Sequence, residues 1–342
     1  MPSTAMSRSS ASSRASAPDV GQRPDPHPPS VTAADQPRHG HEVDHNQDPP
    51  RDGVVIAVGN QKGGVAKTTI TVNLAAALAE QGRRCLVWDL DVNRGASQHV
   101  GIGDNLPLLG SFEVLVGSEP PEEVILKAGD LDGVELPQGL ELIAARRNLE
   151  GIDQALLERE GRFADLPSAL KRALERIRPR YDLIFLDTAP NLTSPTIAAY
   201  KAADYFLLTA MPEAFALQGL NTALGDIAAA RQHGNPGLTL LGVVLSNAEP
   251  RPTRLGRELV EYLQTTFGGL PDHMKPFATA ISRSTIVPTA QKLGRTILSL
   301  DPHHKVSKQF RAVADELERR LAALGALRPR MGEVGRDGAG VR

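Results

Sequence analysis

The chain of 342 residues is poor in several features that would define its class. Its single cysteine, Cys85, cannot form an internal disulfide, and it lies in the apolar run 85–88, which favours buried packing over redox chemistry. There is no run of about 18 apolar residues, which excludes an ordinary membrane-spanning helix. The N-terminal segment lacks the apolar stretch of a secretory signal, so we expect a cytoplasmic protein.

The two ends of the chain differ in composition from the middle. Residues 1–50 are crowded with Ser, Pro, Asp and His and have few aliphatic clusters, so we expect a disordered tail. Its four histidines are irregularly spaced, which favours a solvated tail over a metal-binding tract. The first 17 residues also have the composition of an organellar transit peptide, which stays an alternative. Residues 326–342 are rich in Gly and Arg and are expected to form a flexible tail, which leaves 51–325 as the folded domain.

Between these tails, short apolar runs rich in branched residues alternate with segments of helical periodicity, such as 68–81 and 217–232. Such runs are typical of buried parallel strands. The pattern predicts an α/β fold with a mostly parallel twisted sheet flanked by helices on both faces, and a ligand site at the carboxyl ends of the strands. The expected strands are Val54–Val58, Arg84–Trp88, Leu140–Ala144, Asp182–Leu186, Tyr205–Thr209 and Leu238–Leu245.

The segment 60–69, NQKGGVAKTT, joins the first expected strand to a helix and nearly matches a phosphate-binding loop. Backbone N–H groups of Gly63, Gly64 and their neighbours would point at an anion at the helix N-terminus. Lys67 would reach the β and γ phosphates, and the Thr68 hydroxyl would coordinate Mg²⁺. The segment therefore predicts binding of ATP and Mg²⁺. The expected nucleotide-binding residues in this loop are Gly63, Gly64, Val65, Ala66, Lys67, Thr68 and Thr69.

Two positions of this loop depart from the pattern G-x-x-x-x-G-K-[ST], because Gln61 and Ala66 stand where it has glycine. Alanine is penalised mainly where the backbone φ angle is positive. We therefore expect a right-handed φ at Ala66, where the loop joins the helix.

Carboxylates follow two other expected strands. Asp187 comes directly after the apolar run 182–186 and is expected to hold the Mg²⁺ shell through water. Asp89 and Asp91 follow the run 84–88, and Asp91 is a candidate for orienting the attacking water near the γ phosphate.

The segment KGGVAKTT at 62–69 resembles the deviant Walker A signature KGGxxK[ST] of the ParA/MinD family of P-loop ATPases. The segments 73–75 and 89–91 are similar to the next landmarks of that family, and LIFLDTAP at 183–190 is similar to its Walker B segment. The resemblance covers about residues 53–325. It implies that Lys62 reaches across a dimer interface to the ATP of the partner subunit, so that the active form is a nucleotide sandwich dimer. It also implies Lys62, Lys67 and Asp91 as the catalytic residues.

Three features indicate which branch of the family the chain resembles. The segment 212–220 looks like the ParA/Soj partition branch. The last expected helix, 306–324, has an apolar stripe that is more typical of a core-facing helix than of a membrane-targeting one, so no stable membrane association is expected. One cysteine cannot supply the cluster ligands of the nitrogenase-reductase branch.

A basic region indicates a nucleic-acid partner. Residues 251–330 contain fourteen Lys or Arg against seven Asp or Glu, although the whole chain has a net charge of −2. Such a region suits binding to DNA phosphates without base readout. The resemblance implies Arg254 and Arg283 as non-specific DNA contacts, while a further basic position of the family is Ile286 here.

Two other positions are singled out by the resemblance. The family usually follows its second switch aspartate with Pro-Gln-Gly-Asn, whereas Asp91 is followed by Val-Asn-Arg-Gly at 92–95, which leaves the hydrolysis rate open. Asn247 resembles the asparagine that reads the adenine edge, and a plain turn asparagine is the alternative.

We therefore expect a nucleoid-associated partition ATPase that forms an ATP-dependent homodimer, binds DNA non-specifically and is stimulated by a ParB-like centromere-binding protein. A cargo-positioning relative that acts on a protein assembly, a MinD-like membrane ATPase and a non-hydrolysing DNA-binding scaffold are the alternatives.

Overall fold

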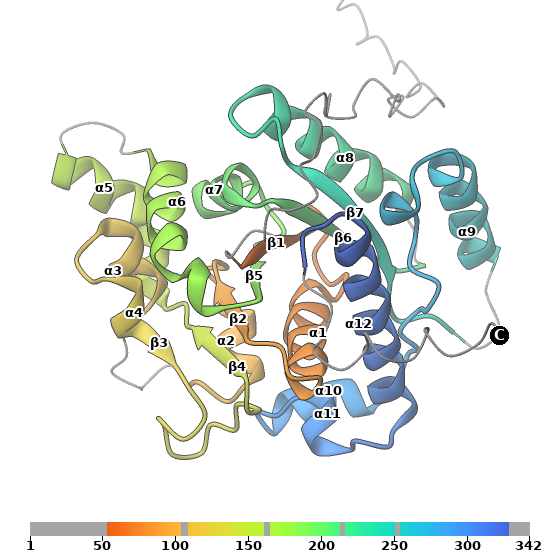
Figure 1. Cartoon of the computed structure of the whole chain (residues 1–342), viewed down its shortest axis with the longest axis horizontal. Helices are drawn as coiled ribbons and strands as arrows, with labels where there is room; N and C mark the ends of the chain where they lie inside the picture. The colour runs from red at the N-terminus through yellow and green to blue at the C-terminus, as the bar shows by residue number, and fades with distance from the viewer. Residues whose placement is uncertain (1–52, 104–108, 161–164, 213–215, 250–253, 328–342) are drawn as a thin grey trace, which may run out of the picture. The chain divides into compact units, whose positions relative to one another are not determined.

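The structure is a computed structural model, and it describes residues 53–103, 109–160, 165–212, 216–249 and 254–327 (Figure 1). The tail expected at 1–50 and residues 328–342 of the tail expected at 326–342 lie outside these residues. At the C-terminal side the described part reaches two residues beyond the expected boundary at 325, and Leu327 there is buried.

The core element is a seven-stranded sheet with the order β3-β4-β2-β5-β1-β6-β7. All neighbouring strands pair in parallel except β3 and β4, which pair antiparallel. The six predicted strands are confirmed with bounds that differ by one or two residues. The seventh, β3, was not predicted, because two residues are too few to show a period. The strands are β1 (Val54–Gly59), β2 (Cys85–Asp89), β3 (Ile125–Leu126), β4 (Leu140–Ile143), β5 (Leu183–Asp187), β6 (Tyr205–Ala210) and β7 (Thr239–Leu245).

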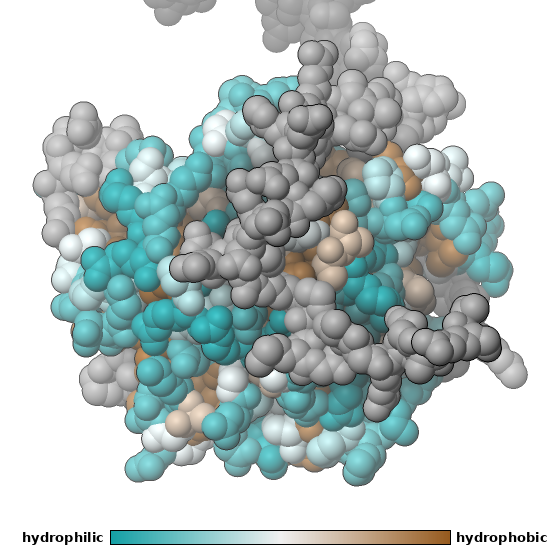
Figure 2. Space-filling model, in the orientation of Figure 1, coloured by the Kyte–Doolittle hydropathy of each residue, from teal (hydrophilic) through white to brown (hydrophobic). Residues whose placement is uncertain are grey.

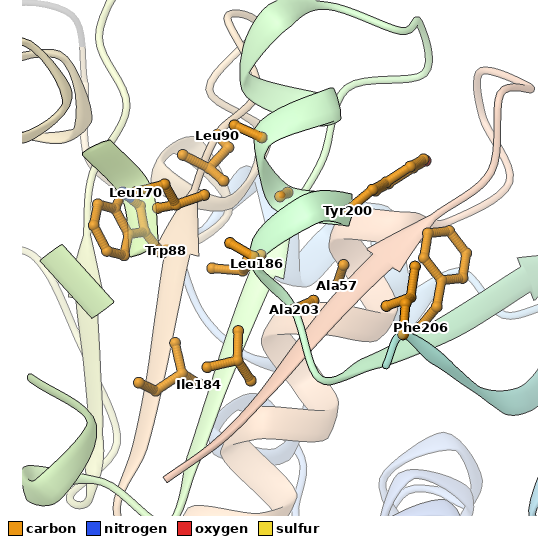
Figure 3. Close-up of a cluster of buried hydrophobic side chains, with 14 of the residues drawn as sticks. Ala57, Trp88, Leu90, Leu170, Ile184, Leu186, Tyr200, Ala203 and Phe206 are labelled. Atoms are coloured by element: carbon orange, nitrogen blue, oxygen red, sulfur yellow. The ribbon is translucent and has the colours of Figure 1, made fainter. Parts of the chain in front are cut away.

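Helices cover both faces of the sheet, as predicted (Figure 1). Alternate residues of β1 enter different cores, because successive side chains of a strand point to opposite faces. Val55 and Ala57 join the first core, part of which is drawn in Figure 3. Ile56 and Val58 join the second.

The first core is closed by α3 (Ser111–Val116), α4 (Pro121–Val124), α5 (Ile152–Glu160), α6 (Leu166–Ile177), α7 (Ser194–Ala202), α8 (Ala216–Gln232) and α9 (Arg254–Phe267). The second core is closed by α1 (Lys67–Glu80), α2 (Gly95–His99), α10 (Ile286–Lys292), α11 (Ile297–Leu300) and α12 (Lys305–Ala323). Short 3₁₀ turns are η2 (Arg147–Gly151), η3 (Arg178–Arg180) and η4 (Asp272–Met274).

The apolar stripe of α12 faces the core, as predicted. Val306, Phe310 and Leu317 are at most 1% exposed, whereas Leu324, just past the helix end, is 37% exposed. Hydrophilic residues predominate among the described residues visible in Figure 2. In the part of the chain that the structure describes, none of the helices is long and apolar enough to cross a membrane.

Arg320 of α12 connects this helix to β7 and to the segment after η4. Its guanidinium donates hydrogen bonds to the carbonyl oxygens of Leu241, Lys275 and Pro276 at 3.2, 2.7 and 3.1 Å. It also lies 4.0 Å from the centre of the Phe277 ring, a cation–π distance. Because all these partners are fixed, the guanidinium has little freedom to move.

Gly242 makes this contact possible. Its φ angle is +95°, and a Cβ at this position would lie 2.2 Å from Arg320 Nη1 and 2.3 Å from the Lys275 carbonyl oxygen. We expect Gly242→Ala to lower the free energy of unfolding by about 3 kcal/mol or more, since strain and overpacking add. Denaturant unfolding measures this loss. The matched control is Gly237→Ala, whose Cβ would meet its nearest atom at 3.8 Å. Equal stability of the two variants would contradict the prediction.

Candidate nucleotide site

A cavity of about 970 Å³ opens at the carboxyl ends of the parallel strands. The first part of its wall is the loop and first turn that follow β1, including Gly63, Gly64 and Lys67. The second part is formed by residues that follow β2, β5 and β7. The third part is the segment 281–285 with the first residues of α10. The volume is at the upper end of the range for small-molecule sites.

The loop 60–66 is held in place by a buried asparagine. Asn60 is 2% exposed, and its Nδ2 donates to the Thr209 carbonyl oxygen of β6 at 2.7 Å. Its Oδ1 accepts from the backbone N–H of Lys62 at 2.9 Å. The start of the loop is therefore fixed before any ligand binds, which reduces the ordering cost of binding.

The backbone at Ala66 contradicts the expectation of a right-handed conformation. Its φ is +62° and ψ is +25°, in the left-handed region, directly before the first residue of α1. The chain must reverse here so that the α1 N-terminus faces the cavity, and this requirement outweighs the preference of alanine. A left-handed conformation costs a non-glycine residue about 1–2 kcal/mol.

Lys67 lies at the base of the cavity and is 7% exposed. Its ammonium Nζ donates to the Lys62 carbonyl oxygen at 3.3 Å. Burial lowers the pKa of Lys67, and the carboxylates of Asp187 and Asp91 partly oppose this shift. The lysine is thus a buried cation in a site where an anionic ligand would compensate its desolvation.

Thr68 joins α1 to the end of β5. Its Oγ1 donates to Asp187 Oδ2 at 2.8 Å, and Thr71 Oγ1 donates to the other oxygen, Oδ1, at 3.1 Å. The structure therefore brings together the two residues that the sequence assigned to Mg²⁺. Thr71 was not predicted, although its position three residues after Thr68 places it on the same face of the helix.

Two carboxylates lie buried side by side at the edge of the sheet. Asp89 and Asp187 are partners in the register of β2 and β5, and both are fully buried. Burial raises the pKa of Asp187 above its usual range, and repulsion from Asp89 adds to the shift. Burial also raises the pKa of Asp89, while hydrogen bonds from the Ser97 backbone N–H and hydroxyl lower it. A divalent cation beside Thr68 and Asp187 would favour the ionised forms, so these oxygens fit Mg²⁺.

The loop after β2 brings Asp91 to the cavity wall, where it is 6% exposed. Asp91 Oδ1 accepts from the backbone and side-chain nitrogens of Asn93 at 2.9 and 3.0 Å. Arg94 in the same loop is left-handed, with φ of +60°. Gly95 packs against Thr68, the candidate Mg²⁺ ligand, because a Cβ at this position would be 2.8 Å from Thr68 Oγ1.

The opposite wall contains residues that the sequence did not indicate. Ser282, Ser284 and Thr285 line it, and Gln291 of α10 donates from Nε2 to Thr69 Oγ1 at 3.2 Å. Nothing in their spacing marks them, because they reach the cavity through the tertiary fold. Asn247 also lines this wall and is left-handed with φ of +53°.

Of the remaining predicted residues, some line the cavity and others do not. Lys62 and Val65 are not among the described residues that line the cavity. Arg283 lines its wall and pairs with Glu249 at 3.3 Å. Arg254 is the first residue of α9, away from this wall, and pairs with Glu258 at 2.8 Å.

Comparisons with known proteins show the family to which the chain belongs. A family model described as an AAA domain matches residues 53–240. The chain is 32% identical to the sporulation initiation inhibitor protein Soj of Bacillus subtilis over 78% of its length and 98% of that protein. It is 33% identical to the chromosome partitioning protein ParA of Caulobacter vibrioides over 77% of its length and 93% of that protein.

The solved structures include a cobyrinic acid a,c-diamide synthase from Mycobacterium smegmatis with bound ADP and magnesium. It is 29% identical to the chain, with a TM-score of 0.64, over 80% of the chain and 98% of that protein. The fold is that of a P-loop ATPase. The chain belongs to the ParA/MinD family of these ATPases.

The left-handed alanine of the loop gives a test of local strain. We expect Ala66→Gly to raise the free energy of unfolding by up to about 1 kcal/mol, because relief of the left-handed strain exceeds the extra entropy that glycine adds to the unfolded chain. Chemical denaturation without nucleotide measures the change. The control, Ala229→Gly on the exposed face of α8, should lower stability by about 1 kcal/mol. A loss of stability in both variants would show that Ala66 is not strained.

Proposed function

We propose that this protein is a DNA partition ATPase that dimerises on ATP, binds DNA non-specifically and hydrolyses ATP when a ParB-like partner stimulates it. The observation that carries the proposal is the hydrogen-bonded set of Thr68, Thr71 and Asp187 beside the P-loop cavity. The similarity to Soj and ParA over nearly their whole lengths supports the partition role.

The ligands are ATP and Mg²⁺. The related structure from Mycobacterium smegmatis holds ADP with magnesium in one case and an ATP analogue with magnesium in another. The N–H groups of the loop, including those of Gly63, Gly64, Val65 and Ala66, would surround the phosphates. Thr68 would hold Mg²⁺ directly and Asp187 through water, while Thr69 and Asn247 complete the nucleotide contacts. When bound, Mg²⁺ neutralises charge on the β and γ phosphates.

Hydrolysis depends on two side chains that line the cavity, those of Lys67 and Asp91. Lys67 neutralises charge that develops on the transferred phosphoryl group, at the base of the cavity where little water screens it. Asp91 orients the attacking water, since its carboxylate lines the cavity and Asn93 fixes one of its oxygens. The other oxygen of Asp91 is the acceptor for a proton of that water.

Lys62 has a different role from Lys67. Its neighbours Gly63 and Gly64 line the cavity and Lys62 does not, which supports a role toward the nucleotide of the partner subunit. A lysine that contacts phosphate in trans makes dimer affinity depend on the γ phosphate. Release of that phosphate then returns the protein to monomers.

Arg254 and Arg283 would contact DNA phosphates. Their side chains are 87% and 68% exposed, and each forms an ion pair with an exposed glutamate, so phosphate can replace the carboxylate. Because Arg283 also borders the cavity, its position would depend on the nucleotide state.

The first test uses Asp91→Ala. We expect this variant to bind ATP but to hydrolyse it at least about 100-fold more slowly, because the water is no longer oriented. It should therefore stay on DNA as an ATP-bound dimer, measured by DNA co-sedimentation and phosphate release. Asp132→Ala, in an exposed loop, is the control and should behave as the unchanged protein.

Adding Arg254→Ala and Arg283→Ala to the Asp91→Ala variant should release it from DNA without restoring hydrolysis. Normal turnover of Asp91→Ala would remove this residue from the mechanism. Binding to anionic liposomes in place of DNA would favour a MinD-like membrane ATPase, and the absence of phosphate release with partner and DNA would favour a non-hydrolysing scaffold.

The second test separates the two lysines. We expect Lys62→Ala to leave nucleotide affinity of the monomer within about twofold while abolishing ATP-dependent dimerisation, since its contact lies in trans. Lys67→Ala should lose nucleotide binding itself. Fluorescent-nucleotide titration and analytical ultracentrifugation with a non-hydrolysable ATP analogue measure the two properties, and Lys127→Ala on an exposed loop is the control. Unchanged dimerisation of Lys62→Ala would refute the trans role.

A further inference from the structure

Lys62 directly follows two residues whose side chains are held by distant elements. The backbone N–H of Lys62 donates to Asn60 Oδ1, and Asn60 is held by β6 through the Thr209 carbonyl oxygen. Gln61 Nε2 donates to Asp226 Oδ2 of α8 at 2.7 Å. The peptide that carries Lys62 is therefore tied to the protein by two side-chain hydrogen bonds that do not involve the cavity.

Asp226 lies in the middle of α8, far from the loop in sequence and partly buried. Burial raises the pKa of Asp226, and the hydrogen bond from Gln61 opposes the shift. A carboxylate in this position gains from a donor, because an unpaired buried charge is costly. Gln61 is thus held by a charge-assisted hydrogen bond, which is stronger than a bond between neutral groups.

The first turn of α8 contacts the same loop directly. A Cβ at Gly219 would lie 3.2 Å from Asn60 Oδ1 and 3.5 Å from Lys62 Cβ. The helix can pass this closely because the residue has no side chain. Gly219 belongs to the segment 212–220 that the sequence singled out, and its contact with the loop gives that segment a physical role.

We propose that α8 is a platform that aims Lys62 at the partner subunit, with Asp226 as a positioning residue that acts through Gln61. The inference rests on the trans role of Lys62 proposed above. A lysine side chain has several rotatable bonds, so its ammonium reaches one place reliably only if its backbone is fixed. Asp226 supplies that fixation from outside the nucleotide cavity.

Asp226→Ala tests the platform. It removes the acceptor of Gln61, and we expect dimerisation with a non-hydrolysable ATP analogue to weaken by about tenfold or more, which corresponds to the loss of about 1.4 kcal/mol. Nucleotide affinity of the monomer should stay within about twofold. Asp226→Asn keeps an acceptor oxygen and should dimerise within about threefold of the unchanged protein. Analytical ultracentrifugation and fluorescent-nucleotide titration give the two readouts.

Two further variants test whether the effect passes through Gln61. Gln61→Ala should match Asp226→Ala, and the double variant should show no additional loss, because both remove one contact. Gly225→Ala, the neighbouring position on α8 where a Cβ would meet nothing within 4 Å, is the control and should dimerise normally. Fluorescence of the only tryptophan, Trp88, and thermal unfolding verify that the variants fold.

The outcomes distinguish this inference from the function it rests on. If Lys62→Ala abolishes dimerisation and Asp226→Ala dimerises normally, the platform is wrong and the trans role stands. If Lys62→Ala dimerises normally, the trans role itself fails. If Asp226→Ala weakens monomer nucleotide binding as much as dimerisation, or if Asp226→Asn is as defective as Asp226→Ala, the positioning role is overturned.

Discussion

The hydrogen bond between Thr68 and Asp187 is the contact on which the site depends. It joins the first turn of α1 to the carboxyl end of β5, two elements that are 119 residues apart in sequence. A buried carboxylate without donors would be strongly unfavourable, so the hydroxyls of Thr68 and Thr71 stabilise Asp187 in its buried position. The same arrangement aligns the N-terminus of α1 with the cavity.

Much of this arrangement could be predicted from the sequence, because it follows from strand periodicity. The runs that became β1, β2 and β5 are short, apolar and bounded, and parallel strands bring their carboxyl ends to one edge. The residues directly after those runs, including Asp89 and Asp187, were therefore expected at one edge of the sheet. The strand order that makes β2 and β5 neighbours, and the side-by-side register of the two aspartates, could not be predicted from the pattern.

Other parts of the site could not be predicted, because they depend on tertiary contacts. The segment 281–285 has no strand or helix pattern, and it reaches the cavity through backbone pairing of Ala248 with residues 281–283. The prediction for Ala66 was wrong for a related reason, since local preference gave way to the direction in which α1 must start. Arg283 was predicted as a DNA contact, and its position in the cavity wall was not predicted.

Backbone strain is concentrated at the site. Among the residues that the structure describes, the non-glycine residues with positive φ are Ala66, Arg94 and Asn247. Ala66 and Asn247 line the cavity, and Arg94 lies in the loop between Asn93, which also lines it, and Gly95, which contacts Thr68. Strained residues persist only where surrounding structure holds them, and here the sheet and both cores do so. The favourable free energy of packing in the two cores therefore offsets the backbone strain around the cavity.

The balance of charge at this edge explains why nucleotide and metal should bind together. Three aspartates, Asp89, Asp91 and Asp187, lie buried near one buried lysine, Lys67, so the site without ligands already has more acidic than basic groups. A triphosphate alone would add negative charge beside these carboxylates, and a divalent cation alone would leave Lys67 desolvated without an anion. Mg²⁺ held by Thr68 would offset the first cost, and phosphate beside Lys67 would offset the second. Each ligand would then create the electrostatic condition that the other needs, which would couple their binding free energies.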